Sequence, residues 1–255
     1  MPVFPEIFAG TIFATNLTVI GTILFTGLVV FVVLRIALAR MDMRSPRGLQ
    51  NFVEWVAEFT TNMARETMPT EQAVGFMLPL AFTMLLFLFV ANWLGLIMTI
   101  AVHFGAHAPA GWGIAPGDLA NAKGEVELFD SPTSNMSMAL AIAVMVWLIS
   151  HARGLRHPKI WLKHFYSPSP LAVIEEITNP LTHGMRLYGN IFAGEALLGI
   201  MLKAPFLFGW IPWQLPLIVL WLLYSLFVAT IQAYVFSILM CLYVGNKSFE
   251  GHSHH

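Results

Sequence analysis

Two charged side chains lie within a long apolar tract near the carboxyl-terminal third of the chain. Arg186 and Glu195 both belong to residues 181–195, which read LTHGMRLYGNIFAGE. A charged side chain that faces lipid costs several kcal/mol, so charges inside membrane segments face a bundle interior, a water-filled cavity or a partner. Such residues indicate a pathway for ions or protons.

Further polar residues recur along the same predicted helix. Asn190 follows Arg186 by four residues, and Thr182 and Thr178 precede it by four and eight, which places them near one helical face. Glu195 lies nine residues beyond the arginine, roughly on the opposite side at about 100° per residue and about 14 Å further along the axis. The arginine and the glutamate therefore do not form a simple ion pair within the helix.

The next apolar tract adds an amide and a hydroxyl. Gln232 and Ser225 are seven residues apart and share a helical face. An amide in hydrocarbon requires a hydrogen-bonding partner. Because the two helices run antiparallel, Gln232 is predicted to meet the level of Arg186 and Asn190. Ser225 is predicted to lie nearer Glu195.

Each of these residues alone has a simpler interpretation. A lone arginine can belong to a buried structural ion pair, and a lone amide often joins two helices. Together they predict a polar line across the bilayer, with hydroxyls leading inward and a carboxylate leading outward, interrupted at Arg186. A continuous pore would leak ions, whereas a line interrupted by a permanent cation would not.

The composition defines the class of protein that holds these residues. The chain has 255 residues, of which 57% are hydrophobic and 11% charged, and its mean hydropathy is +0.72. This balance excludes a soluble domain, and the tracts are too long and uniformly apolar for a β-barrel. One cysteine excludes an intrachain disulfide framework, and no basic block suggests nucleic acid. We predict one all-α integral membrane domain over residues 1–255.

Five apolar tracts are long enough to cross a bilayer, which takes about 20 residues. They cover residues 16–38, 76–101, 133–152, 170–203 and 212–245. The last two could each reach roughly 50 Å at 1.5 Å per residue, which is more than a perpendicular crossing needs. They are therefore predicted to form a long hairpin that tilts strongly, protrudes or follows a curved partner.

A sixth helix is predicted at about residues 46–66. Its apolar positions recur at helical spacing opposite Gln50, Glu54 and Glu58, and they are Leu49, Phe52, Val53, Val56 and Phe59. This pattern indicates an amphipathic helix lying on the cytoplasmic interface. A helix packed on a soluble partner remains the alternative.

The distribution of basic residues predicts the orientation. Basic residues follow the first span (Arg35, Arg40, Arg44, Arg47) and the third (Arg153, Arg156, Lys159, Lys163). Residues 102–131 instead carry four acidic residues against one lysine. The positive-inside rule then places the amino terminus outside and the carboxyl terminus in the cytoplasm.

Enzymatic and metal sites find no support in the sequence. No His-x-x-x-His pair encloses a glutamate, which argues against a metalloprotease site, and no nucleophile–base pair is evident. We expect no metal, no cofactor and no active site in this chain.

Four stretches resemble one known family. NPLTHGMRLYGNIFAGE, PRGLQNFVEWVAEF, SPTSNMSMALAIAV and ATIQAYVFSILMCLYV are similar to subunit a of the bacterial F-type ATP synthase, the static channel subunit of the membrane Fo sector. The resemblance covers nearly the whole chain and is most specific around Arg186. It implies a non-catalytic subunit of the bacterial cell membrane with two offset half-channels that couple proton flow to ATP synthesis.

The resemblance also implies partners and a role for Arg186. The partners are the ring of subunit c, the peripheral stalk of subunit b, membrane lipid and the whole F1Fo complex. Arg186 matches the essential arginine that faces the proton-carrying carboxylates of the rotating ring. Asn190 and Gln232 match its polar neighbours.

The half-channel residues follow from the same resemblance. Glu195 matches the acidic residue of the half-channel open to the outside, and Ser225 stands where many members carry a histidine. Glu176 and Thr182 match positions of the half-channel open to the cytoplasm, to which we add Thr178.

Two departures and two alternatives stay open. His183 stands where a leucine is common, and Asn135 stands where an aspartate is usual. An ion-coupled secondary transporter would show repeats or broken helices, which are absent from the sequence pattern. A non-catalytic membrane scaffold would not explain the four polar residues Arg186, Asn190, Glu195 and Gln232.

Overall fold

Six helices among the described residues carry the architecture of the computed structural model. The structure describes residues 4–7, 15–39, 42, 48–98, 100–104, 112, 114, 119, 125–155, 158, 172–204 and 213–249. The helices are α1 (Leu17–Leu38), α2 (Leu49–Thr67), α3 (Glu71–Ile97), α5 (Met136–Gly154), α7 (Ala172–Leu202) and α8 (Leu215–Phe249). A 3-10 turn, η1 (Pro132–Ser134), precedes α5.

Four of the five predicted spans meet the length and hydropathy of a membrane crossing. They are α1, α3, α5 and residues Leu215–Gly245 of α8. The fifth, α7, has 31 residues, but Glu175, Glu176, Arg186 and Glu195 lie within it. The described residues therefore form an all-α, polytopic membrane fold, and the crossing by α7 depends on where its charges lie.

The ends of the predicted second and third spans differ from the structure. Helix α3 begins at Glu71, because the Thr70 hydroxyl accepts a hydrogen bond from the Ala73 amide, and it ends at Ile97 instead of 101. Helix α5 begins at Met136 because the Asn135 side chain accepts from the amide of Met138. Asn135 is thus a helix cap.

Two short antiparallel ribbons also lie outside the sequence-based prediction. Strand β3 (Ile100–His103) pairs with β4 (Glu125–Phe129), and β1 (Glu6–Ile7) pairs with β2 (Thr15–Asn16). The backbone of residues 100–103 bonds to a distant strand instead of continuing α3, a long-range pairing that hydropathy does not reveal.

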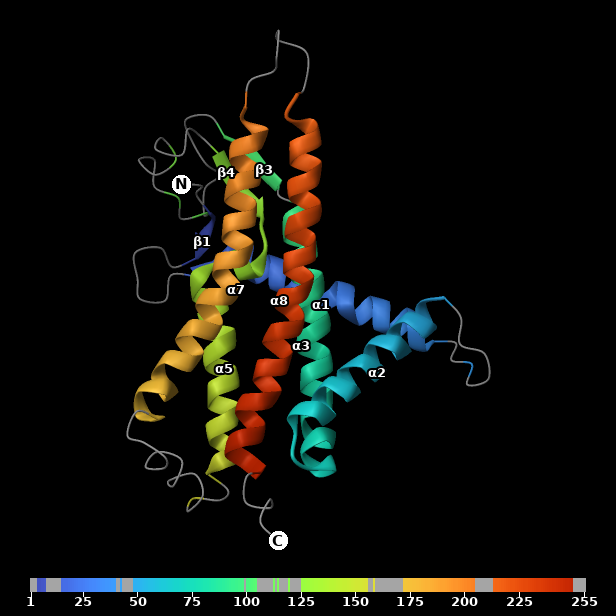
Figure 1. Ribbon diagram of the computed structural model, residues 1–255. Coiled ribbons are helices and arrows are strands. Elements are labelled where there is room, and N and C mark those ends of the chain that lie inside the picture. Colours follow the sequence, from blue (N-terminus) through green and yellow to red (C-terminus); the bar gives the residue numbers. More distant parts are fainter. Residues whose placement is uncertain are drawn as a thin grey trace.

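The helices pack around α8. Figure 1 shows α7 and α8 as a long hairpin, with α5 beside the first half of α7 and α3 beside α8. Helix α1 runs across the direction of this hairpin, so the two cannot be parallel (Figure 1). A membrane that α1 crosses steeply would therefore contain a strongly tilted hairpin.

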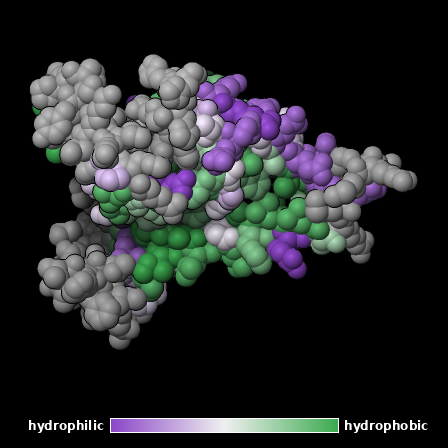
Figure 2. All heavy atoms as spheres, turned by 90° about the horizontal axis from the view of Figure 1, so that it is seen from below, coloured by the Kyte–Doolittle hydropathy of each residue, from purple (hydrophilic) through white to green (hydrophobic). Residues whose placement is uncertain are grey.

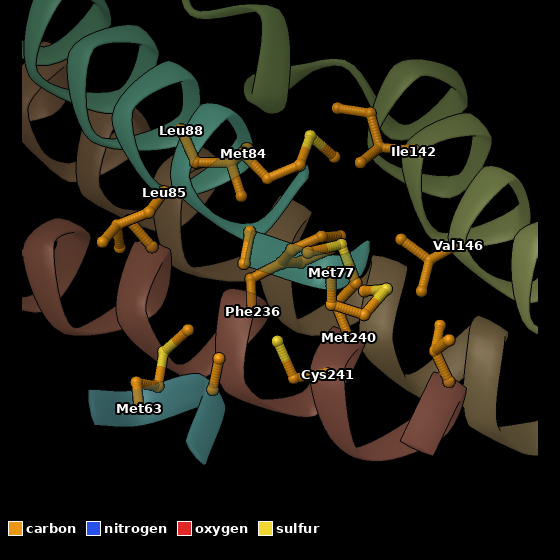
Figure 3. Packing of buried hydrophobic residues seen from close by; sticks show 14 of the residues in the cluster. Met63, Met77, Met84, Leu85, Leu88, Ile142, Val146, Phe236, Met240 and Cys241 are labelled. Atoms are coloured by element: carbon orange, nitrogen blue, oxygen red, sulfur yellow. The ribbon is translucent and has the colours of Figure 1, made fainter. Parts of the chain in front are cut away.

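The core lies where α8 meets α3 and α5. Phe236, Met240 and Cys241 of α8 are fully buried against Met77 of α3 and Val146 of α5 (Figure 3). Cys241 is a packing residue of this core, as the sequence indicates.

Helices α5 and α7 approach closely at a glycine. A Cβ atom on Gly184 of α7 would lie 2.8 Å from Leu140 Cδ2 of α5. Small residues permit such close contacts between membrane helices. This contact fixes α7 so that one of its sides faces the bundle and the other faces outward.

Only part of the predicted apolar face of α2 is buried. Val53 and Val56 are buried against the bundle, whereas Phe52, Trp55 and Phe59 remain exposed as a series of neighbouring rings. Gln50, predicted on the polar face, is buried, and it donates to Glu54 Oε1 at 2.7 Å. The helix itself is confirmed, and its exposed side carries aromatic as well as charged groups.

Candidate functional site

Arg186 lies on the outward side of α7. The residue is exposed, and the structure gives it no ion pair with an acidic side chain among the described residues. Exposed polar side chains lie one turn away on the same face, Thr182 and Asn190, and the exposed apolar side chains of Met185 and Leu181 lie beside them. A permanent cation on the outward side of a membrane helix requires water or a partner that compensates its charge.

An amide pair joins the two long helices at the level of the arginine. Asn190 Nδ2 donates to Gln232 Oε1 at 2.8 Å. Gln232 is buried, and its Nε2 atom has no hydrogen-bond partner among the described residues. The structure thus brings Gln232 of α8 to the turn of α7 that follows Arg186, where the antiparallel arrangement predicts it.

Glu195 and Ser225 lie further along the hairpin, toward its loop. Glu195 is half-buried, and the preceding Gly194 packs on α8, where an added Cβ atom would lie 3.4 Å from Ser225 Oγ. The Ser225 side chain is buried, and its hydroxyl has no partner among the described groups. Ser225 therefore lies at the level of Gly194, one residue before Glu195.

The hairpin is fixed at this level by a tryptophan. Trp221 Nε1 donates to the carbonyl of Gly194 at 3.1 Å. This contact sets the register of α7 against α8 next to Glu195.

The three residues assigned to the inner side do not share one face. Thr178 and Thr182 are exposed on the side of Arg186, and their hydroxyls donate to carbonyls of their own helix, at 3.3 Å to Glu175 and 2.7 Å to Thr178. Glu176 is only 6% exposed and faces the bundle.

Two side chains of α5 hold the Glu176 carboxylate, and sequence reasoning missed both. Trp147 Nε1 donates to Glu176 Oε1 at 3.1 Å, and His151 Nε2 lies 3.5 Å from the same oxygen. The spacing of Trp147 and His151, one turn apart at the end of a span, was the available signal. Only the packing of α5 on α7 identifies the carboxylate that they meet.

A second polar cluster lies between α3, η1 and α8. Thr133 Oγ1 donates to Asn92 Oδ1 at 2.7 Å, and Asn92 Nδ2 donates to the Ala229 carbonyl at 3.4 Å. Ser131 Oγ lies 2.8 Å from Thr133 Oγ1. Asn92, a lone amide in an apolar tract, was the signal that sequence reasoning left unused. The cluster fixes the start of α5 against α3 and α8.

Comparisons with known proteins agree with this arrangement. A sequence model of the family described as "ATP synthase A chain" matches residues 19–245. ATP synthase subunit a of Staphylococcus epidermidis is 35% identical over 246 residues, covering 93% of this chain and 92% of the relative. The Staphylococcus aureus protein of the same name is 36% identical over 247 residues, with 93% and 92% coverage. That of Enterococcus hirae is 34% identical over 241 residues, with 90% and 91% coverage.

Proposed function

Because the chain belongs to the family of ATP synthase subunit a, the non-catalytic proton-channel subunit of the Fo sector, we propose that Arg186 is the fixed cation at which ring carboxylates exchange protons. The observation that carries the proposal is the exposed position of Arg186 on the outward side of α7, without an acidic partner among the described residues. The missing anion is then supplied by the ring of subunit c.

The physical chemistry of arginine explains the exchange. A guanidinium stays protonated under essentially all conditions, whereas a carboxyl group of the ring can be neutral or charged. The neutral form moves through lipid, and the ionised form is favoured beside Arg186 because opposite charges attract. A ring carboxyl thus releases its proton when it reaches the arginine, and it takes up another after passing it.

Two half-channels deliver and remove these protons. We assign Glu195 and Ser225 to the half-channel open to the outside, and Glu176, Thr178 and Thr182 to the one open to the cytoplasm. Asn190 and Gln232 hold the amide pair beside the arginine. The driving force is about 2.3 kcal/mol per charge per 100 mV of membrane potential, and Arg186 prevents direct flow between the two half-channels.

The outward surface of the hairpin has the properties that a ring requires. Apolar side chains are exposed along α8, including Leu223, Phe227 and Ile231. Seen from below, the molecule also carries apolar side chains next to hydrophilic ones (Figure 2). The strongly tilted hairpin can follow the curve of a ring over its length. A further contact with subunit b belongs to the remaining surface of the subunit.

Cross-linking tests this surface. Ile231 is 44% exposed and adjoins Gln232, so a cysteine at Ile231 should form a disulfide with a cysteine in the outer helix of the ring when a mild oxidant is added. Leu24 of α1 is 68% exposed and supplies the matched control, because α1 runs across the hairpin. Both variants are made in a Cys241→Ala background. A cross-link from position 24 with none from position 231 would reject the proposed ring surface.

The proposed orientation places the amino terminus outside and the carboxyl terminus in the cytoplasm of a bacterial cell, within one membrane domain over residues 1–255. Five spans then include α7, whose charges lie in the half-channels, and α2 lies at the cytoplasmic interface.

Single cysteines at Gly10, Gly124 and Ser248 can be labelled in intact cells with an impermeant thiol reagent. We expect labelling at positions 10 and 124 only; labelling at 248 without labelling at 124 would reverse the orientation.

A further inference from the structure

An acid–base pair lies inside the bundle at the inner end of α7. His151 of α5 and Glu176 of α7 are 3.5 Å apart, and their side chains are 13% and 7% exposed. The Trp147 indole also donates to the carboxylate. A carboxylate and an imidazole in contact can pass a proton between them near neutral pH, where an imidazole titrates. The pair lies away from the exposed threonines of the inner half-channel.

A second histidine lies two turns further along the same side of α7. His183 follows Glu176 by seven residues, about 10 Å along the helix, and is 2% exposed. Its ring packs on Phe236 at 4.0 Å between centroids and meets Tyr243 edge-on at 5.8 Å. Neither ring nitrogen has a hydrogen-bond partner among the described groups.

These nitrogens indicate a place for water. A buried polar group without a hydrogen bond is costly, and buried water usually supplies the missing partner. A leucine at this position would fill similar space without the cost. The histidine therefore contributes something other than packing.

A third unpartnered group continues the line toward the arginine. Gln232 lies one turn before Phe236 on α8, and its Nε2 atom is buried without a partner among the described groups. The amide oxygen of Gln232 accepts a hydrogen bond from Asn190, which lies one turn after Arg186. Buried polar groups thus extend from His151 through Glu176, His183 and Gln232 to the level of Arg186.

We propose that the inner half-channel has a branch inside the subunit, in which His183 is a proton-relay residue between the ring site at Arg186 and the Glu176–His151 pair. The proposal rests on the proposed function and deepens it. During synthesis, a ring carboxyl releases its proton to water beside Gln232. That water protonates one nitrogen of His183, and the other nitrogen gives up its proton to a second water. This water protonates Glu176, which passes the proton to His151 and so to the cytoplasm.

The groups around His183 are compatible with this step. Helix α5 presents His151, α8 presents Tyr243, whose ring meets that of His183, and α7 itself carries Glu176 and Arg186. The cation at Arg186 repels a proton on His183 and so directs it toward the carboxylate of Glu176. The threonine hydroxyls on the outer side already donate to their own helix.

The test uses whole F1Fo complexes in inverted membrane vesicles. ATP-driven proton pumping is measured while the pH on the cytoplasmic face is varied between about 5 and 8, the range around the pKa of an unperturbed imidazole. His183→Leu is expected to lower the pumping rate at least about tenfold, the loss of an acid–base group. His183→Gln keeps a polar group for water but cannot accept and release a proton, so its rate should fall less than that of His183→Leu and stay below that of the wild type.

Two further variants make the result specific. Ser237→Ala removes a buried hydroxyl of α8 that already bonds to the Ala233 carbonyl, and it should pump at the wild-type rate. His151→Gln, at the inner end, should weaken the pH dependence of the pumping rate. It tests the internal branch if His183→Leu fails to assemble. Arg186→Ala in the same vesicles tests the proposed function separately.

The outcomes separate the two ideas. Loss of coupling in Arg186→Ala together with wild-type rate and pH profile in His183→Leu would overturn the internal branch and leave the proposed function intact. If His183→Leu does not assemble, a wild-type profile in His151→Gln has the same meaning. Coupled pumping in Arg186→Ala would overturn the proposed function, and with it the branch.

Discussion

Replacement of Arg186 by alanine is expected to abolish ATP synthesis and ATP-driven proton pumping while the complex still assembles. The residue is exposed, so its loss leaves no cavity in the core, and the Asn190–Gln232 hydrogen bond does not depend on it. Without the cation, the ionised form of a ring carboxyl is no longer favoured at the interface with the subunit. A passive proton leak between the half-channels is also expected, because the positive charge no longer separates them.

Measurements on inverted vesicles decide this prediction. The amount of assembled complex, ATP hydrolysis and proton pumping are compared with those of Arg65→Ala. Arg65 is an exposed arginine whose ion pair with Glu71 spans 3.3 Å, and such surface pairs contribute about 0–1 kcal/mol. The control should pump normally. Normal pumping by Arg186→Ala would disprove the assigned role.

The sequence predicts those parts of the site that depend on one helix or on antiparallel pairing. The positions of Arg186 and Glu195 on different sides of α7 follow from helical periodicity. The meeting of Gln232 with Asn190 follows from the reversal of the chain between α7 and α8, and the structure shows the hydrogen bond. All six predicted helices are present among the described residues, and each begins and ends within five residues of its predicted bounds, since hydropathy is a strong signal over long segments.

Contacts between helices that are distant in sequence could not be predicted in the same way. The partners of Glu176 come from α5, and the choice of Trp147 and His151 depends on the close approach at Gly184. On the predicted apolar face of α2, Val53 and Val56 are buried against the bundle, whereas Phe52 stays exposed and Phe59 contacts the bundle only through the ring of Tyr234. Periodicity identifies a face but not the neighbour that covers it.

The Glu195 carboxyl group is expected to limit proton entry from the outside. It is half-buried and displaced from Arg186 along α7, so it can exchange protons with water that enters between the helices of the subunit. Glu195→Gln keeps the shape and the hydrogen bonding of the side chain but cannot carry the proton. We expect proton flux to fall about a hundredfold, the low end of the contribution of a positioned acid–base group.

Flux is measured in Fo-containing vesicles under a fixed potential, with every variant assembled to the same level. Glu58→Gln provides the matched control, because Glu58 is an exposed carboxylate on α2 and its replacement should leave the flux unchanged. Equal flux in Glu195→Gln and wild type would refute the assignment of Glu195 to the outer half-channel.

Ser225 should matter far less than Glu195, although it lies beside the same path. A hydroxyl can hydrogen-bond the carboxylate or hold a water, but it does not titrate near neutral pH as an imidazole does. One neutral hydrogen bond is worth about 1 kcal/mol, which corresponds to roughly a fivefold change in rate. Ser225→Ala is therefore expected to slow flux by no more than about this factor, in the same vesicles. A larger loss in Ser225→Ala than in Glu195→Gln would mean that the serine controls proton entry, and that the carboxylate has only a supporting role. The predicted order instead follows from the chemistry of the two groups: the buried hydroxyl, without a partner among the described residues, can organise water, whereas the carboxylate can bind and release the proton itself.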